Sequence, residues 1–134
     1  MAEGKVTFEL VSPERLLASA EVDMVVVPGT EGDFGVLPGH APFISTVRTG
    51  IIDIHDGGKV IDRIFVADGF AEVTPERCTV LASEAVPIGA IERAAVEKRI
   101  QGAELDLRDA ANDEERAKAE AALAIARAML EAAR

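Results

Sequence analysis

Aromatic and basic side chains are both scarce in this sequence of 134 residues. It has no Trp, no Tyr and five Phe, and it carries 14 Lys and Arg against 24 Asp and Glu, for a formal net charge of −10. Few aromatic rings leave little surface on which bases can stack. Binding to nucleic-acid phosphates or to anionic lipid headgroups depends on Lys and Arg. We therefore expect no nucleic-acid partner and no direct insertion into lipid.

Cysteine and long apolar runs are also nearly absent. Cys78 is the single cysteine, so no internal disulfide can form, and one thiol is typical of a reducing compartment. Its setting in a β-rich run favours inert packing over reactivity. No apolar run approaches the ~18–20 residues that span a bilayer, and the first residues lack the basic and apolar regions of a signal peptide. We expect a cytoplasmic chain, which can still sit on a membrane complex.

Residues 1–86 show the period of two that is typical of half-buried β-strands. In 21–27, for example, Val22, Met24 and Val26 fall on one face. Turn-forming Gly, Pro and Asp residues separate the runs. Strands are predicted at 6–11, 21–27, 51–56, 59–66 and 78–83. Many short strands at close spacing indicate a domain over 1–86 that is an antiparallel β-sandwich or flattened barrel.

Residues 87–134 change to a helical period. The spacing i, i+4, i+7, i+11 predicts one apolar face of a first helix, formed by Val96, Ile100, Ala103 and Leu107. Glu104 and Arg108 stand at i, i+4 with the acid first, which is the favourable order for an ion pair on a helix.

A second helix is predicted to begin at Asn112, because Glu115 three residues later completes a capping box. Its apolar stripe is rich in alanine and consists of Ala119, Ala122, Ala126, Met129 and Ala133, flanked by Leu123 and Leu130. An alanine-rich seam lets two helices approach closely. The sequence therefore predicts an antiparallel two-helix hairpin domain over 87–134.

The segment 31–42 reads EGDFGVLPGHAP and is the strongest candidate for a site. Three interpretations compete: a phosphate-binding loop, half of a metal or catalytic site, and a rigid surface read by another protein. Gly29, Gly32 and Gly35 lie at three-residue spacing, but no Lys-Ser or Lys-Thr follows and no helical pattern begins there. The two acidic residues of the segment would repel a phosphate, so the first interpretation is disfavoured.

The second interpretation is a metal or hydrolytic site that uses one of the two histidines. Neither His40 nor His55 stands in a metal-ligand pattern, so no metal and no cofactor are expected. His40 could form an acid–base pair with Asp33, and an independent β-sandwich with ligand-binding or hydrolytic activity stays open as the alternative. The simpler interpretation of His40 is a turn residue whose ring bonds a nearby backbone group, and no catalytic residue is assigned.

A rigid docking surface fits the segment best. Proline fixes its own φ angle and biases the preceding residue toward extended geometry, whereas glycine permits turns closed to other residues. A stiff loop loses little entropy when a partner binds. The loop scaffold is predicted to consist of Gly35, Pro38, Gly39 and Pro42, and the contact residues to be Glu31, Asp33 and His40.

Three blocks of sequence resemble one known family. Residues 32–50, with the core GVLPGHAP, are similar to the signature of the epsilon subunit of bacterial F-type rotary ATP synthases, and 64–73 and 78–86 agree downstream. The resemblance implies a ten-stranded β-sandwich followed by a two-helix hairpin. It also implies a non-catalytic subunit of the central stalk, on the cytoplasmic face of the bacterial inner membrane.

The partners that the resemblance implies are the gamma subunit and the membrane-embedded ring of c subunits. Glu31, with Asp33 and His40, would meet the polar loops of the ring. One side of the sandwich and the hairpin would pack on gamma. In some members the hairpin also reaches the alpha and beta subunits and blocks ATP hydrolysis, so regulation by the hairpin is a further implication.

Two positions depart from the family pattern. Asp68 precedes Gly69 where many members have two glycines. Members that bind ATP on the hairpin carry an Asp three residues before an Arg-Ala pair. Here Arg93 and Ala94 match that pair, but Ala90 replaces the Asp. This replacement argues against ATP binding.

Overall fold

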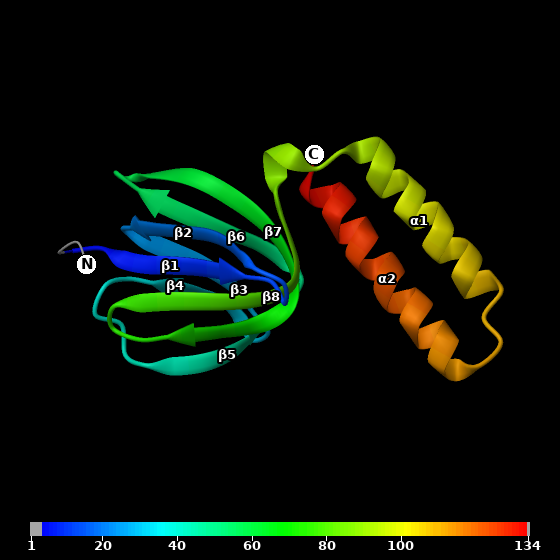
Figure 1. Ribbon diagram of the computed structural model, residues 1–134, viewed down its shortest axis with the longest axis horizontal. Helices are drawn as coiled ribbons and strands as arrows, with labels where there is room; N and C mark the ends of the chain where they lie inside the picture. Colours follow the sequence, from blue (N-terminus) through cyan, green and yellow to red (C-terminus); the bar gives the residue numbers. More distant parts are fainter. Residues whose placement is uncertain (1–3, 134) are drawn as a thin grey trace. The chain divides into compact units, whose positions relative to one another are not determined.

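The computed structural model describes residues 4–133, and the chain splits after Pro87 into two compact units. Strands make up the first unit and an antiparallel pair of helices makes up the second, as Figure 1 shows for each unit. The predicted fold class, a β-sandwich followed by a helical hairpin, is confirmed. No helix in the described range is long and apolar enough to cross a membrane.

The described part of the first unit contains eight strands. They are β1 (Val6–Val11), β2 (Leu16–Val22), β3 (Met24–Gly29), β4 (Gly32–Val36), β5 (Phe43–Val47), β6 (Gly50–Asp56), β7 (Lys59–Val73) and β8 (Arg77–Pro87). Their hydrogen-bonded order is β2-β1-β8-β7-β5-β3-β4, with β6 pairing to β3 and β7. The pairing of β1 with β8 is parallel. The other pairings are antiparallel.

The eight strands replace the ten that the family resemblance implied, because β7 and β8 each serve both layers of the sandwich. The first half of β7 pairs with β6, and its second half, from Gly69, pairs with β5. β8 accompanies β7 over both halves and pairs with β1 only through residues 77–81. Each of these two long strands thus takes the place of two shorter strands, one in each layer.

The change of partner in β7 occurs at a tight corner. Asp68 has a positive φ of 40°, which L side chains rarely adopt. A Cβ atom on Gly69 would lie 2.0 Å from the carbonyl oxygen of Leu81, so only glycine fits there. The departure at Asp68 therefore falls on a strained position, whereas the glycine beside it is sterically required.

The core lies between the two layers and is almost entirely aliphatic. Its fully buried members include Phe8, Leu10, Ile52, Val66 and Val80. The predicted face of 21–27 was half wrong. Val22 is buried, but Val25 and Val27 point into the core in place of Met24 and Val26. The prediction failed because the chain leaves β2 at Asp23 and begins β3, which resets the alternation.

The second unit begins with a short 3₁₀ turn, η1 (Ile88–Ala90), and continues as α1 (Arg93–Arg108) and α2 (Asp113–Ala132). As predicted, Asn112 caps α2, and its side chain accepts a hydrogen bond of 2.8 Å from the backbone N–H of Glu115. The carboxylate of Glu115 in turn accepts one from the N–H of Ala111. These bonds satisfy donors that a helix start otherwise leaves open.

The seam between the helices follows the predicted stripes except at Ala122. Val96 and Ala103 of α1 are buried. The buried residues of α2 are Ala119, Leu123, Ala126 and Met129. Ala122 is exposed, contrary to the prediction, because Leu123 occupies the seam there. Glu104 does not pair along its own helix with Arg108; it accepts a hydrogen bond from Arg127 across the hairpin at 3.4 Å.

Candidate functional site

Glu31 stands at the tip of the turn between β3 and β4. Gly29 and Gly32 are the last paired residues of that hairpin. Thr30 anchors the turn, since its N–H donates to the carbonyl of Thr46 at 3.2 Å and the two hydroxyls lie 2.8 Å apart. The turn is thus held in place, and the exposed side chain of Glu31 has no hydrogen bond or ion pair to another described residue.

Asp33 follows on β4 and is engaged by Arg48, from the turn between β5 and β6. The guanidinium donates to the Asp33 carboxylate at 2.7 Å and to the carbonyl of Gly29 at 2.7 Å. Both side chains stay about half exposed. Arg48 therefore ties the two turns together and offsets the charge of Asp33, so Glu31 carries the uncompensated charge at this end of the sandwich.

His40 lies in the loop between β4 and β5, which is tied down as a rigid loop should be. Gly39 has a φ of 81° and donates its N–H to the carbonyl of Pro75 at 2.7 Å. The Nδ1–H of His40 donates to the carbonyl of Ala41 at 2.7 Å, and the ring lies against Phe43 with centroids 5.1 Å apart. The simpler interpretation of His40, as a turn residue bonded to nearby backbone, is confirmed.

One member of the predicted scaffold has a different role. Gly35 lies inside β4 without a positive φ, so it forms no turn; a Cβ there would be in ordinary contact with the sulfur of Met24, at 3.4 Å. Gly39 takes the turn role alone, between Pro38 and Pro42. The stiffness of the loop thus comes from the two prolines and Gly39.

The three predicted contact residues are not brought to one place. Glu31 precedes β4 and His40 follows it, and a strand of five residues spans about 17 Å at about 3.4 Å per residue. The structure brings Glu31 and Asp33 to one end and leaves His40 at the other. The acid–base pair of His40 with Asp33 does not form, because each group is bonded elsewhere. The hydrolytic alternative loses its geometric basis.

A shallow cleft of about 370 Å³ runs between β4 and β5, beside Glu31. Phe34 and Phe43 are among its lining residues, and their rings meet edge to face with centroids 5.0 Å apart. The described residues contain no group of three or more His, Cys, Asp or Glu side chains placed to hold a metal ion. The thiol of Cys78 is fully buried, and burial raises its pKa to about 12.

A second surface was missed by sequence reasoning. Strand register aligns one apolar side chain from each of four neighbouring strands, in the order Leu16, Val11, Leu81 and Phe70. We call these four residues the apolar row. They point away from the core, since their strand neighbours Leu10, Val80 and Ala71 are buried. The sequence does show apolar residues at positions that should point outward, in strands whose side chains alternate between core and solvent. Their alignment into a row, however, depends on strand register.

Charged side chains border the apolar row. They lie two residues along the strands, on the same outer face. Glu9 of β1 accepts hydrogen bonds from Arg77 at 3.1 Å and from Thr79 at 3.5 Å, both on β8. Glu72 of β7 is exposed and has no ion pair with another described residue. The border is therefore acidic on balance, like the chain as a whole.

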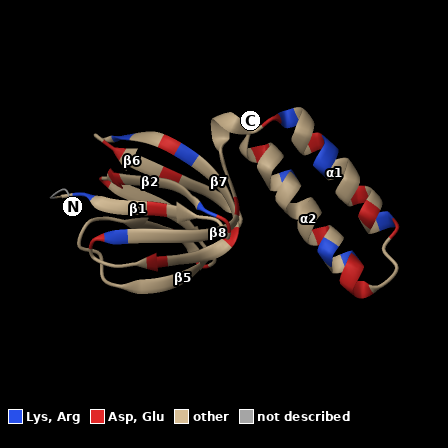
Figure 2. Cartoon of the chain, viewed as in Figure 1, with Lys and Arg blue, Asp and Glu red and all other residues tan. Residues whose placement is uncertain are grey.

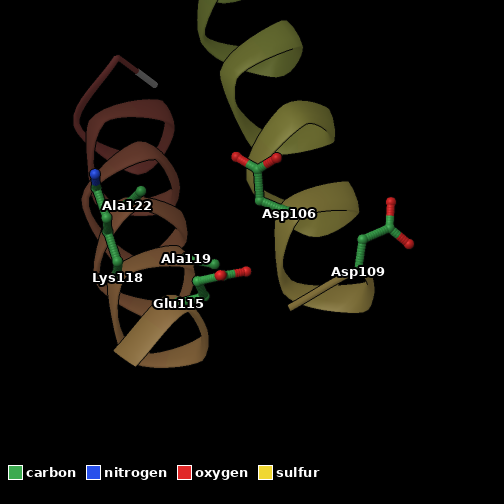
Figure 3. Close-up of a pocket in the computed structure, with 6 residues that line it drawn as sticks. All are labelled: Asp106, Asp109, Glu115, Lys118, Ala119 and Ala122. Carbon is green, nitrogen blue, oxygen red and sulfur yellow. The ribbon is translucent and has the colours of Figure 1, made fainter. Parts of the chain in front are cut away.

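The hairpin carries its own charges, with acidic and basic side chains along both helices (Figure 2). A pocket of about 400 Å³ near its closed end is lined by Asp106, Asp109, Glu115, Lys118, Ala119 and Ala122 (Figure 3). The Glu115 carboxylate is already used by the start of α2. Arg93 and Ala94, which match the ATP motif of the resembling family, stand at the opposite end of α1. The pocket is thus a feature of the helix turn.

A β-sandwich with a proline-stiffened loop, followed by a helical hairpin, defines a class of two-domain proteins. Comparison with known families is more specific. Residues 5–88 match the beta-sandwich domain of the ATP synthase delta/epsilon chain, and residues 92–134 match the C-terminal domain of the ATP synthase epsilon chain. The chain belongs to the ATP synthase epsilon chain family, which confirms the resemblance found in its sequence.

Individual relatives agree over nearly the whole length. The ATP synthase epsilon chain of Rhodospirillum rubrum is 58% identical over 125 residues, covering 93% of each chain. That of Paramagnetospirillum magneticum is 57% identical over 129 residues, covering 96% of each. Among solved structures, a chain of the Euglena gracilis mitochondrial ATP synthase (OSCP/F1/c-ring) matches with a TM-score of 0.78 and 25% identity, covering 98% of this chain and 82% of the other.

Proposed function

We propose that the chain is a central-stalk subunit of an F-type ATP synthase, which couples rotation of the c-ring to the gamma subunit during proton-driven ATP synthesis. The observation that carries this proposal is the match of both family domains, in order and without a gap longer than a linker, to residues 5–88 and 92–134. A similar solved chain comes from an assembly described as OSCP/F1/c-ring. The role is transmission of torque, with no bond-making step.

A non-catalytic role is supported by how the polar groups are used. Asp33 is neutralised by Arg48, His40 is bonded to backbone, and Cys78 is buried. No buried side-chain N or O atom of the described residues lacks a hydrogen-bond partner. An active site usually keeps such groups open to a substrate. The chain would work at the cytoplasmic face of the bacterial inner membrane, held there by its partners.

The c-ring contact is assigned to the end of the sandwich that carries Glu31. Its carboxylate is exposed and unpaired, on a turn that Thr30 and Arg48 hold in place. A fixed negative charge suits a partner with basic loops, because complementary charge favours docking in one orientation. Asp33 supports this end through Arg48. His40 lies at the far end of β4, so it takes no part in the contact assigned to this end.

The hairpin is proposed as a separate domain, 87–134, which can regulate ATP hydrolysis through contacts with the alpha and beta subunits. Its two helices bury their own seam, so it can keep its fold while it moves. β8 extends to Pro87, one residue beyond the predicted domain boundary. The replacement by Ala90, in η1, argues for regulation without bound ATP.

The test is reconstitution of the ATP synthase with and without this chain. We expect the complex that lacks the chain to hydrolyse ATP without pumping protons, and full coupling to return when the chain is added. A truncated chain that ends at Pro87 should restore ATP synthesis. The rate of ATP hydrolysis by the complex with this truncated chain, compared with the full-length chain, would measure inhibition by the hairpin. A chain that never associates with the gamma subunit would overturn the proposal.

A further inference from the structure

We propose that Asp56 is a site of aspartate isomerisation, a spontaneous covalent modification, and that Lys5 and Asp23 protect it in the folded protein. The inference concerns the turn between β6 and β7 and does not depend on the partners assigned above. An aspartate is most reactive before a glycine, which has no Cβ atom to hinder attack and leaves the backbone free to turn. Asp-Gly occurs at 56–57 and at 68–69 of this chain.

The reaction joins two neighbouring groups of the turn. The backbone nitrogen of Gly57 attacks Cγ of the protonated Asp56 carboxyl; the nitrogen gives up a proton and Cγ a hydroxyl, which leave together as water. A five-membered succinimide results. Water then opens this ring, either at Cγ, which restores aspartate, or at the main-chain carbonyl carbon, which gives isoaspartate. The chain then runs through the former side chain and is one carbon longer at the turn.

The turn itself is open to this reaction. Asp56 pairs with Lys59, so Gly57 and Gly58 form a two-residue hairpin loop. Their φ angles of 63° and 79° are positive, as a type I′ turn requires. Both glycines are exposed, so water, which the second step consumes, reaches the loop. Protection must therefore come from contacts outside the turn.

Each of the two reacting groups is bound by a side chain from elsewhere in the sandwich. The ammonium of Lys5 lies 2.5 Å from the Asp56 carboxylate. This ion pair exists only with the carboxylate ionised, and an ionised carboxylate has no hydroxyl to lose. The N–H of Gly57 donates to the Asp23 carboxylate at 2.9 Å, which holds the attacking nitrogen and its proton in place. Both requirements of the first step are thus blocked.

The two protecting residues also hold each other. One carboxylate oxygen of Asp23 lies 2.8 Å from Lys5, and the other accepts from Gly57. Lys5 immediately precedes β1, and Asp23 lies between β2 and β3. The contacts therefore close a ring through three segments that are distant in the sequence, and loss of either residue should expose Asp56 to the reaction.

The second Asp-Gly pair provides an internal reference. The side chain of Asp68 is exposed and has no hydrogen bond or ion pair to another described residue. Gly69, however, pairs with Val47 on one side and Ala82 on the other, so the sheet holds its backbone. Isoaspartate at 68 would report opening of the sandwich, whereas isoaspartate at 56 alone would report loss of the local contacts.

The experiment follows isoaspartate in the full-length chain during long incubation at neutral pH. Labelling by an isoaspartyl methyltransferase measures the total, and peptide mapping assigns it to 56 or 68. The test variants are Lys5→Met and Asp23→Ala. The matched control is Arg77→Met, which removes a partly exposed ion pair with Glu9 elsewhere in the sandwich. A synthetic peptide of residues 52–61 gives the rate of the unprotected sequence.

We expect the wild-type chain to form isoaspartate at 56 many-fold more slowly than the peptide. Each test variant should raise the rate at 56 several-fold, with the rate at 68 unchanged and the control equal to wild type. A wild-type rate at 56 as fast as that of the peptide would overturn the inference, and so would test variants that react no faster than wild type. Rates that rise together at 56 and 68 would assign the reaction to unfolding and also overturn it.

Discussion

The carboxylate of Asp33 and the guanidinium of Arg48 lie 2.7 Å apart and join β4 to the turn between β5 and β6. Arg48 also holds the carbonyl of Gly29, at the end of β3. Two turns far apart in the sequence therefore form one rigid end of the sandwich. The ion pair leaves Glu31, between Gly29 and Asp33, as the free acid of that end.

Reversing the charge of Glu31 should uncouple the enzyme without unfolding the sandwich. Replacing this exposed carboxylate with a cation, in Glu31→Lys, turns attraction to a basic partner loop into repulsion. We expect proton-driven ATP synthesis in reconstituted vesicles to fall several-fold, with the melting temperature nearly unchanged. The matched control is Glu14→Lys, an exposed acid between β1 and β2. Equal loss in both variants, or in neither, would remove Glu31 from the contact.

Gly69→Ala should be among the most destabilising single substitutions in the sandwich. The added Cβ would lie 2.0 Å from the carbonyl oxygen of Leu81, so the corner of β7 must open. We expect a loss of about 3–5 kcal/mol in the free energy of unfolding, measured with urea. Gly102→Ala is the control, because a Cβ there meets nothing within 4 Å inside α1. That change should stabilise the helix by about 0.5–1 kcal/mol, and a corner variant as stable as wild type would contradict the geometry.

The cluster of Lys5, Asp23 and Asp56 should make the free energy of unfolding depend on pH in the acidic range. Lys5 lies 2.8 Å from Asp23 and 2.5 Å from Asp56. The hydrogen bond from Lys5, together with the N–H of Gly57, lowers the pKa of Asp23 below its usual 3.8. A pKa that is lower in the folded state adds stability above the unfolded pKa, and this stability is lost as the pH falls through the folded value.

Asp23→Asn should therefore reduce stability at neutral pH, and the difference from wild type should shrink as the pH falls below 3.8, the usual pKa of an Asp carboxyl. The same cluster raises the pKa of Lys5 above 10.5, so its contribution is present below that pH and is lost as the pH rises further. Urea unfolding of wild type and variant at pH 3, 5 and 7 would check the sign. A difference between the two proteins that stays constant over this range would argue against the cluster.

Cys78 should be unreactive until the sandwich unfolds. Its side chain is fully buried, and burial raises the pKa of the thiol to about 12, so almost no thiolate exists at neutral pH. We expect a maleimide or an aromatic disulfide reagent to label it at the rate of unfolding at pH 7–8. Ile44→Cys, at a position 65% exposed, gives the control, which should be labelled at once. Equally fast labelling of Cys78 in native protein would show that the strand opens locally.

Much of the architecture could be predicted from the sequence, because local residue preferences and tertiary packing favour the same elements. The helical period from Val96, the capping box at Asn112 and the strand β1 each follow from short-range preferences that packing then reinforces. The face of β3 was misread because one residue, Asp23, ends a strand and shifts the alternation by one. An alternating pattern of apolar and polar residues does not show where one strand ends and the next begins, so this shift could not be predicted.

The candidate site was also predicted in part: the stiff loop was correct, but the grouping of its contact residues was not. Sequence reasoning found the stiff loop with Pro38, Gly39 and Pro42, since proline and glycine act on the backbone wherever they stand. It also placed Glu31 and His40 together because they are close in the chain. The structure separates them by the length of β4, since an extended strand moves neighbours in sequence apart faster than any other element.

The sequence by itself determined the family, the order of sandwich and hairpin, the scarcity of basic and aromatic surface, and the burial of Cys78. These follow from composition, from periodicity and from motifs that act over a few residues. Only the tertiary structure decided that Asp33 is neutralised by Arg48, that Glu31 remains free, and that four apolar residues of four strands form one row. Such relationships depend on strand register, and register is set by how distant segments pair across the whole sandwich.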